Sequence, residues 1–119
     1  MIVLDDILRD RGSRYAAAFG PVTNRAEIDA FLTTLRSRRK FAKATHHSWA
    51  AVLTDGGPTK GDDGEAGAGA VILKMLEREG LVDCIIVVTR WYGGVQLGGD
   101  RFAHIVTCTR AAVAVLRVG

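Results

Sequence analysis

Alternation of apolar and polar residues predicts three main strands and one short additional one. Residues 14–22 are rich in alanine and aromatic residues and end at Gly20-Pro21, which indicates a strand running into a turn. Residues 47–53 predict a second strand, and the turn-forming segment 55–63 has room for a short extra strand. The apolar, β-branched run 84–89 predicts a strand that is buried on both faces.

Helical periodicity appears in three segments. Asn24 lies three residues before Glu27, the spacing of a capping box, and apolar residues then recur at i, i+3, i+4 and i+7. A second helix is predicted from near residue 65 to residue 79, with Gly80 as its stop signal. The last helix is predicted to begin after Asp100 as N-cap and to run to about residue 117.

The resulting order, β-α-β-α-β-α, predicts an α/β (α+β) two-layer domain in which helices cover one face of a single sheet. A chain of 119 residues with 48% hydrophobic and 24% charged residues is typical of one globular domain. No apolar run approaches the roughly 18 to 20 residues of a membrane span, and no secretory signal is expected. Cys84 and Cys108 lie in apolar contexts and are predicted to be reduced core thiols, which favours the cytoplasm.

The net charge of +3 is small, but the basic residues are concentrated after the first helix. They form a predicted basic patch of Arg36, Arg38, Arg39 and Lys40, continued by Lys43. Cations near a helix C-terminus are often only a solvated end that complements the helix dipole. The alternative is a surface that meets phosphates or an acidic partner.

Two clusters of titratable residues have both a structural and a functional interpretation. His46 and His47 are neighbours on a strand and point to opposite faces, which predicts one core or edge histidine and one solvent histidine. Either one could instead act as a base or cation near neutral pH. Asp62, Asp63 and Glu65 are typical acids at a helix start, although three carboxylates also resemble a site for a hard cation.

Glycines accompany the acidic cluster and the end of the last strand. Gly67 and Gly69 in the first turns of the second predicted helix indicate that a strand or a ligand approaches the backbone closely. Arg90, Trp91 and Tyr92 precede the glycine-rich loop 93–99, where they could stack on a base, bind a phosphate or anchor an interface. The structural alternative pairs Arg90 with the acids and packs the aromatic rings over the sheet.

Four motifs in this order resemble the Impact/YigZ family, over nearly the whole chain from about residue 7. They are residues 10–15 with 21–22, residues 43–49 with Ser48 in place of the family's cysteine, residues 62–65 with Gly67 and Gly69, and residues 87–94 with 97–98. Residues 100–102 and 104–105 resemble the eukaryotic branch, and Ala66 replaces the proline of bacterial members. The spacing of all four motifs is close to the family's.

The resemblance implies a fold like that of a small-subunit ribosomal protein's second domain and of domain IV of elongation factor G. It implies a single Impact-type domain over residues 1–119, with residues 1–8 as a short N-terminal extension. Family members are proposed to bind nucleic acid or the ribosome. The eukaryotic ones dampen the amino-acid-starvation response by competing for the activator of a kinase that senses uncharged tRNA. That role uses an N-terminal RWD domain, which we expect here to be lacking, as is the bacterial C-terminal domain.

We therefore expect a non-enzymatic, cytoplasmic module of translation control that binds RNA, the ribosome or a translation-regulatory protein. Basic side chains would contact phosphates while Trp91 or Tyr92 stacks or docks. A pure protein-binding decoy with these two aromatics as anchors is a related alternative. No cofactor, metal or membrane is expected. The predicted binding cleft contains Lys43, His46, His47, Asp62, Asp63, Glu65, Arg90, Trp91, Tyr92, Asp100 and Arg101.

The alternative from another class is a hydrolase or phosphoryl-handling enzyme. Its histidines, carboxylates and Arg90 would converge on one cleft, with magnesium as a conceivable metal. The sequence contains no GxSxG elbow, P-loop or GxGxxG motif in a suitable context. Ser48 neighbours His47 but is expected to face away from it, and Cys84 lies in an apolar strand.

Overall fold

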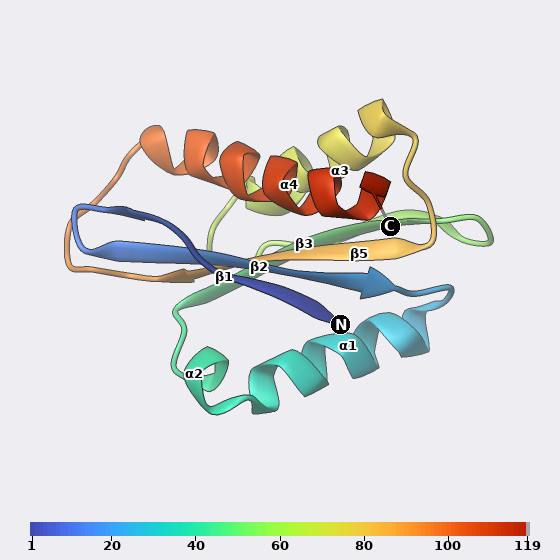
Figure 1. Cartoon of the computed structure of the whole chain (residues 1–119), viewed down its shortest axis with the longest axis horizontal. Coiled ribbons are helices and arrows are strands. Elements are labelled where there is room, and N and C mark those ends of the chain that lie inside the picture. Colours follow the sequence, from blue (N-terminus) through green and yellow to red (C-terminus); the bar gives the residue numbers. More distant parts are fainter. Residues whose placement is uncertain (119) are drawn as a thin grey trace.

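The computed structural model describes residues 1–118 and consists of one five-stranded sheet and four helices (Figure 1). The elements in chain order are β1 (Ile2–Asp10), β2 (Ser13–Pro21), α1 (Arg25–Ser37), α2 (Arg39–Ala42), β3 (His46–Leu53), β4 (Gly57–Gly61), α3 (Ala68–Glu79), β5 (Cys84–Trp91) and α4 (Asp100–Val118). The strand order is β1-β2-β5-β3-β4, and every neighbouring pair is antiparallel. The fold is therefore α+β, as predicted, with β5 at the centre of the sheet.

Helices cover both faces of the sheet, which corrects the expected two-layer arrangement with helices on one face. α3 and α4 lie on one side of the sheet and α1 and α2 on the other (Figure 1). All eight residues of β5 are buried, as predicted for this strand. Because successive side chains of a strand point to opposite faces, a strand buried throughout needs an apolar layer on each side.

Two separate apolar clusters result from this alternation. Phe19 and Ile86 point toward α3 and α4, where they pack with Ile72 and Ile105 in one cluster. Their strand neighbours point the other way and pack against α1 and the single turn α2. This second cluster includes Ala18, Val87, Ile28, Leu35, Phe41 and Trp91.

Several local predictions are confirmed by the cap geometry. The Asn24 side chain accepts a hydrogen bond from the backbone N–H of Glu27 at 2.8 Å and so caps α1. Gly80 ends α3 in the left-handed conformation, with φ of 64°. α3 itself begins at Ala68 rather than near Glu65, because Gly67 adopts a left-handed φ of 88° that interrupts the helix.

Close approach at Gly69 explains why the sequence places a glycine there. A Cβ atom on Gly69 would lie 2.6 Å from Oδ1 of Asp62 and 3.0 Å from the carbonyl oxygen of Gly61. The neighbouring segment is the end of β4, the short extra strand for which residues 55–63 were predicted to have room. The strand that was expected to approach the backbone of α3 closely is therefore β4.

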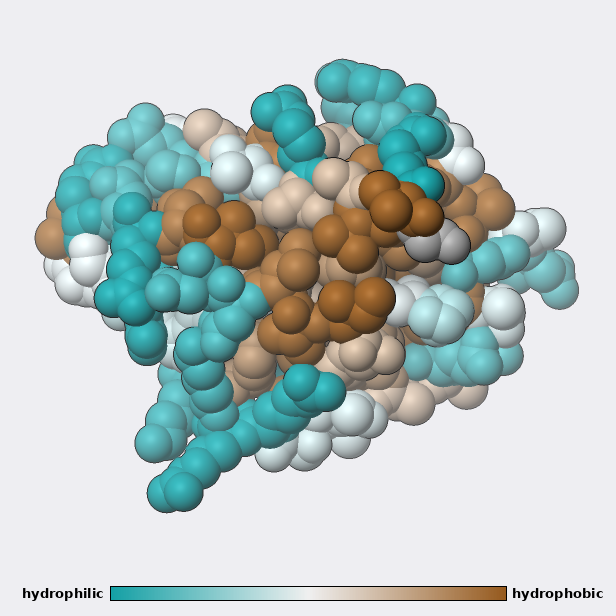
Figure 2. Space-filling model, in the orientation of Figure 1, coloured by the Kyte–Doolittle hydropathy of each residue, from teal (hydrophilic) through white to brown (hydrophobic). Residues whose placement is uncertain are grey.

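Strand β1 is absent from the elements predicted above. Residues 2–8, expected as an extension, pair with β2 at the edge of the sheet, with a register irregularity between Leu4 and Leu8. Asp5 and Asp6 interrupt the alternation there, and Asp6 adopts a left-handed φ of 52°, so the strand pattern is hidden in the sequence. Figure 2 shows apolar side chains across the middle of the face that carries β1 and α4.

Both cysteines are free and buried, as predicted. Burial raises the pKa of the Cys108 thiol to about 12 and raises that of Cys84 as well. Both thiols are therefore poor nucleophiles at neutral pH. Within residues 1–118, no helix is both long enough and apolar enough to cross a bilayer.

Candidate binding site

The sequence motifs meet at one end of the sheet, where they are divided between its two faces. Arg90 and Trp91 are the last residues of β5, and their side chains alternate between the faces. Trp91 belongs to the apolar cluster under α1 and α2, whereas Arg90 contacts Glu65 on the side of α3 and α4. His46 is the register partner of Arg90 on β3.

Arg90 forms a buried ion pair with Glu65. Its Nη1 donates to Oε1 of Glu65 at 2.8 Å, with side-chain exposures of 6% and 2%. A second donor, Nη2, reaches Oγ of Ser13 at 3.3 Å. The guanidinium group also lies 5.7 Å from the ring centre of Tyr15 and 5.5 Å from that of Tyr92. The pairing of Arg90 with the acidic cluster, given above as the structural alternative, is confirmed.

The carboxylates of Asp62 and Asp63 accept hydrogen bonds from backbone N–H groups. The carboxylate of Asp62 accepts hydrogen bonds from the N–H groups of Gly67 at 3.2 Å and Gly69 at 2.7 Å, at the start of α3. Asp63 accepts from the N–H of His47 at 3.0 Å and lies 3.6 Å from Nη2 of Arg36. In the part of the chain that the structure describes, no three His, Cys, Asp or Glu side chains are placed to hold a metal. The helix-start interpretation is confirmed for Asp62 only, since Asp63 bonds the start of β3 and Glu65 pairs with Arg90.

The adjacent histidines have separate environments, as their alternation predicted. His46 is partly exposed, and its Nδ1 donates to the carbonyl oxygen of Asp63 at 2.9 Å. His47 is buried, its Nε2 donates to the carbonyl oxygen of Phe41 at 3.0 Å, and its Nδ1 accepts from Oγ1 of Thr89 at 2.9 Å. Because Thr89 is completely buried, this hydroxyl and imidazole are closed to any substrate.

We expect His47 to make stability fall as the pH is lowered. Burial lowers the pKa of His47 below its ordinary value of 6.5, so the unfolded chain takes up a proton that the folded chain does not. Stability contributed by the neutral imidazole is present above pH 6.5 and is lost as the pH falls through that value toward the lower folded pKa. Thermal unfolding followed at about pH 7.5 and about pH 5.5 measures this loss.

The matched variants for this measurement are His47→Gln and His46→Gln. The first is expected to reduce the difference in melting temperature between the two pH values, because the titrating group is gone. The second is the matched comparison, because it removes the neighbouring, partly exposed histidine. An equal effect of both variants would contradict the assignment to His47.

Trp91 is not available for stacking on a ligand, which corrects the expectation that it is exposed. Its exposed fraction is 8%, its indole Nε1 donates to the carbonyl oxygen of Lys40 at 3.1 Å, and Phe41 packs against it edge to face at 5.1 Å. Arg14 and Lys40 lie over the ring at 5.5 and 5.4 Å. Trp91 therefore anchors α2 to the sheet and supports the cations above it. Tyr92 is 43% exposed.

A basic surface surrounds this tryptophan. Arg14, Arg39, Lys40, Lys43 and Trp91 line an open pocket of about 390 Å³. Lys40 is held by an ion pair with Asp5 at 2.6 Å, whereas Arg39 and Lys43 are exposed and form no ion pair within residues 1–118. We call these four cations with Trp91 the basic surface.

Only part of the predicted basic patch reaches the basic surface. Arg39 and Lys40 line the pocket, but Arg36 pairs with Asp63 and Arg38 is the exposed residue between α1 and α2. Arg14 belongs to the surface and was missed. It stands directly opposite Trp91 in the β2–β5 register, a relation that needs the strand pairing and leaves no local signal in the sequence.

A second pocket, of about 290 Å³, lies on the other side of β5. It is lined by Thr45, His46, Gly64, Glu65, Arg90, Tyr92, Gln96 and Arg101. Five of the predicted cleft residues meet here, whereas Lys43 and Trp91 line the basic surface. His47, Asp62 and Asp63 are engaged nearby as described, and Asp100 pairs with Arg11 at 2.5 Å. The single predicted cleft is therefore two pockets, separated by the sheet.

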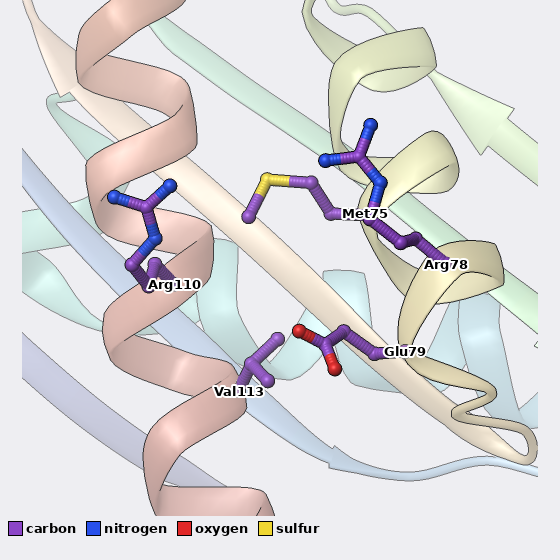
Figure 3. A pocket seen from close by; sticks show the side chains of 5 residues that line it. All are labelled: Met75, Arg78, Glu79, Arg110 and Val113. Atoms are coloured by element: carbon purple, nitrogen blue, oxygen red, sulfur yellow. The ribbon is translucent and has the colours of Figure 1, made fainter.

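A third hollow, between α3 and α4, contains none of the predicted site residues. Met75, Arg78 and Glu79 of α3 face Arg110 and Val113 of α4, and Met75 extends across the gap toward α4 (Figure 3). Its volume of about 80 Å³ is well below the roughly 300 Å³ of the smallest ordinary ligand pockets. It is a packing gap between two helices.

Comparison with known proteins gives consistent matches at the level of sequence and fold. The model of the Impact N-terminal domain family matches residues 11–113. A Protein IMPACT homolog of Caenorhabditis elegans is 37% identical over 112 residues, which are 88% of this chain and 44% of that protein. Protein IMPACT of Bos taurus is 38% identical over 108 residues, 87% of this chain and 34% of that protein. The chain thus spans less than half the length of these relatives.

Two solved structures share the fold. A hypothetical protein superposes with a TM-score of 0.80 at 24% identity, over 94% of this chain and 57% of its own. The two-domain translational regulator Yih1 superposes with a TM-score of 0.56 at 36% identity, over 88% of this chain and 43% of its own.

Proposed function

The chain belongs to the Impact family, and from this membership we propose that it is a module of translation control that acts by binding rather than by catalysis. A translational regulator among its structural relatives supports this role. We also propose a cytoplasmic location, because free thiols such as those of Cys84 and Cys108 are the norm there.

The observation that carries the proposal is the basic surface. Four cations gather around one open pocket in a chain whose net charge is only +3. Arg39 and Lys43 stay exposed, so both are free to contact a partner, and the buried indole of Trp91 fixes the backbone that bears Lys40. A concave surface with such an excess of one charge attracts a partner of the opposite charge.

We infer that this partner is an acidic surface of a translation-regulatory protein. Exposed aromatic rings for stacking unpaired bases are the usual feature of RNA-binding surfaces, and Trp91 at the basic surface is instead covered by Arg14 and Lys40. RNA or the ribosome remains the second form of the proposal, because phosphates would meet the same cations.

Catalysis finds less support than binding. The hydroxyl of Ser48 donates to the carbonyl oxygen of Asp62 at 3.0 Å, and Thr89 with His47 is closed to substrates. The carboxylate of Asp62 caps α3, and that of Glu65 holds Arg90. A nucleophile in contact with an accessible base is the minimum for the hydrolase alternative. The exposed hydroxyl–carboxylate contacts of Thr23 with Glu27 and of Thr54 with Asp83 lie outside the predicted cleft.

Reversing two charges on the basic surface is expected to abolish partner capture. Arg39→Glu/Lys43→Glu changes the local charge by four units. It breaks no ion pair within residues 1–118, because neither side chain forms one there. We expect at least about a tenfold loss of the proteins recovered from a cell lysate, since paired surface charges steer and hold an acidic partner. Recovery is measured by mass spectrometry, with and without RNase.

The control is Lys74→Glu/Arg78→Glu, the same change of charge on exposed positions of α3 on the other side of the sheet. A set of proteins that survives RNase and is lost only in the Arg39/Lys43 variant supports the protein form. Ribosomal proteins that disappear on RNase treatment would replace it with the RNA form. Equal recovery by wild type and the Arg39/Lys43 variant would refute both.

A further inference from the structure

The pocket beside Arg101, on the opposite side of β5 from the basic surface, holds more positive charge than its own carboxylate neutralises. Arg90 and Arg101 face one carboxylate, that of Glu65, which already pairs with Arg90. Arg101 is half-buried, its guanidinium group lies 4.7 Å from the ring centre of Phe102, and it forms no hydrogen bond or ion pair within residues 1–118. The donors of Arg101 therefore have no acceptor in the part of the chain that the structure describes.

Unpartnered polar atoms are concentrated at this pocket. Among the described residues, the buried side-chain nitrogen and oxygen atoms that lack a hydrogen-bond partner are Nε of Arg90, Nε of Arg101 and the hydroxyl of Tyr15. Both arginines line the pocket, and the ring of Tyr15 lies against the Arg90 guanidinium at 5.7 Å. Buried donors normally find an acceptor, so their accumulation at one place indicates an acceptor that comes from outside the chain.

Gln96 adds a further donor to the same space, because its amide has no hydrogen-bond partner in residues 1–118. His46 also lines the pocket, but its Nδ1 donates to the backbone, so the Nε2 of the neutral ring is an acceptor. The donors Arg101, Arg90 and Gln96 come from different segments, namely α4, β5 and the glycine-rich loop. Donors from three segments suit a ligand with three acceptor oxygens better than one with two.

We propose that this pocket binds a phosphoryl group of a small ligand through Arg101, with Arg90 and Gln96 around it. The Arg90–Glu65 pair holds one wall of the pocket. Tyr92 fixes the Arg90 guanidinium from the exposed side at 5.5 Å. The site is independent of the basic surface, because Arg90 and Trp91 lie on opposite faces of the sheet.

Inorganic phosphate is the probe that tests this site. A titration followed by backbone amide NMR is expected to shift the signals of Gly64, Tyr92 and Gln96, which line the pocket, with smaller changes elsewhere. Acetate at the same ionic strength is expected to bind more weakly. Arg101→Gln should weaken phosphate binding about tenfold to a hundredfold, the usual effect of losing hydrogen bonds to a charged group.

Arg110→Gln is the matched control, because it removes the same charge from an exposed position of the same helix. It is expected to leave phosphate binding unchanged. Arg101→Lys, which keeps the charge and loses the fork of donors, should bind with intermediate affinity, and thermal unfolding reports whether each variant is folded. The proposal is overturned if wild type shows no shifts at these amides, if acetate binds as well as phosphate, or if Arg101→Gln binds like wild type. None of these results depends on the lysate experiment with Arg39 and Lys43.

Discussion

Replacing Glu65 by alanine is expected to lower the free energy of unfolding by about 3–5 kcal/mol. Its carboxylate is 2% exposed and is the ion-pair partner of the Arg90 guanidinium, which is 6% exposed. Without Glu65 the arginine remains buried beside Tyr15 as an uncompensated charge. Since a domain of this size is stable by only about 5–15 kcal/mol, this one change removes a large part of its stability.

Urea denaturation followed by circular dichroism measures the effect, and a double-mutant cycle separates the ion pair from ordinary packing. Glu65→Ala/Arg90→Met should be more stable than the sum of the two single losses predicts, because the double variant leaves no unpaired charge in the interior. Glu77→Ala, at an exposed position of α3, should change stability by no more than about 0.5 kcal/mol. Strictly additive losses at positions 65 and 90 would contradict the interpretation.

Gly93→Ala is expected to be the second severe change, with a loss of about 3 kcal/mol or more. A Cβ atom at position 93 would lie 2.0 Å from the carbonyl carbon of Gly12 and 2.4 Å from the backbone nitrogen of Ser13. Both contacts are backbone atoms of the β1–β2 turn, so no flexible side chain can move aside. The backbone N–H of Gly93 also donates to Oγ of Ser13 at 3.1 Å, and this contact would be displaced.

The glycine-rich loop contains its own control. Around Gly99 there is no atom within 4 Å of an added Cβ, and its φ is not in the left-handed range. Gly99→Ala should therefore cost no more than about 1 kcal/mol, the penalty for alanine in the position directly before α4. Thermal and urea unfolding of the two variants compare the positions directly. Similar stability of both variants would show that the β1–β2 turn can yield to a methyl group at Gly93.

Short-range patterns carried most of the correct predictions. Asn24 and Gly80 mark helix ends through hydrogen bonds to residues within a few positions. The run 84–89 was recognised as a buried strand from its apolar, β-branched composition. The opposite environments of His46 and His47 follow from the two-residue period of a strand. The family resemblance rests on motifs of the same local kind and is confirmed by the match over residues 11–113.

Predictions failed where a residue's environment is made by segments far away in the chain. Trp91 was expected to stack or dock on a partner because it precedes the glycine-rich loop, yet Phe41 and Lys40 of α2 cover it. Helices were expected on one face, although a strand buried on both sides requires two layers. β1 was missed because its bulge at Asp5 and Asp6 breaks the alternation that identifies an edge strand.

The sequence by itself therefore determined the class of fold, most of the elements and the residues that carry the motifs. Only the tertiary structure decided that Arg14 joins the basic surface, that Arg101 and Arg90 share a pocket, and that the sheet separates the two. The reason is physical: caps, turns and strand alternation depend on neighbours within a few residues. Which charges are paired, covered or left free depends on strand register and helix packing between residues as far apart as 14 and 91.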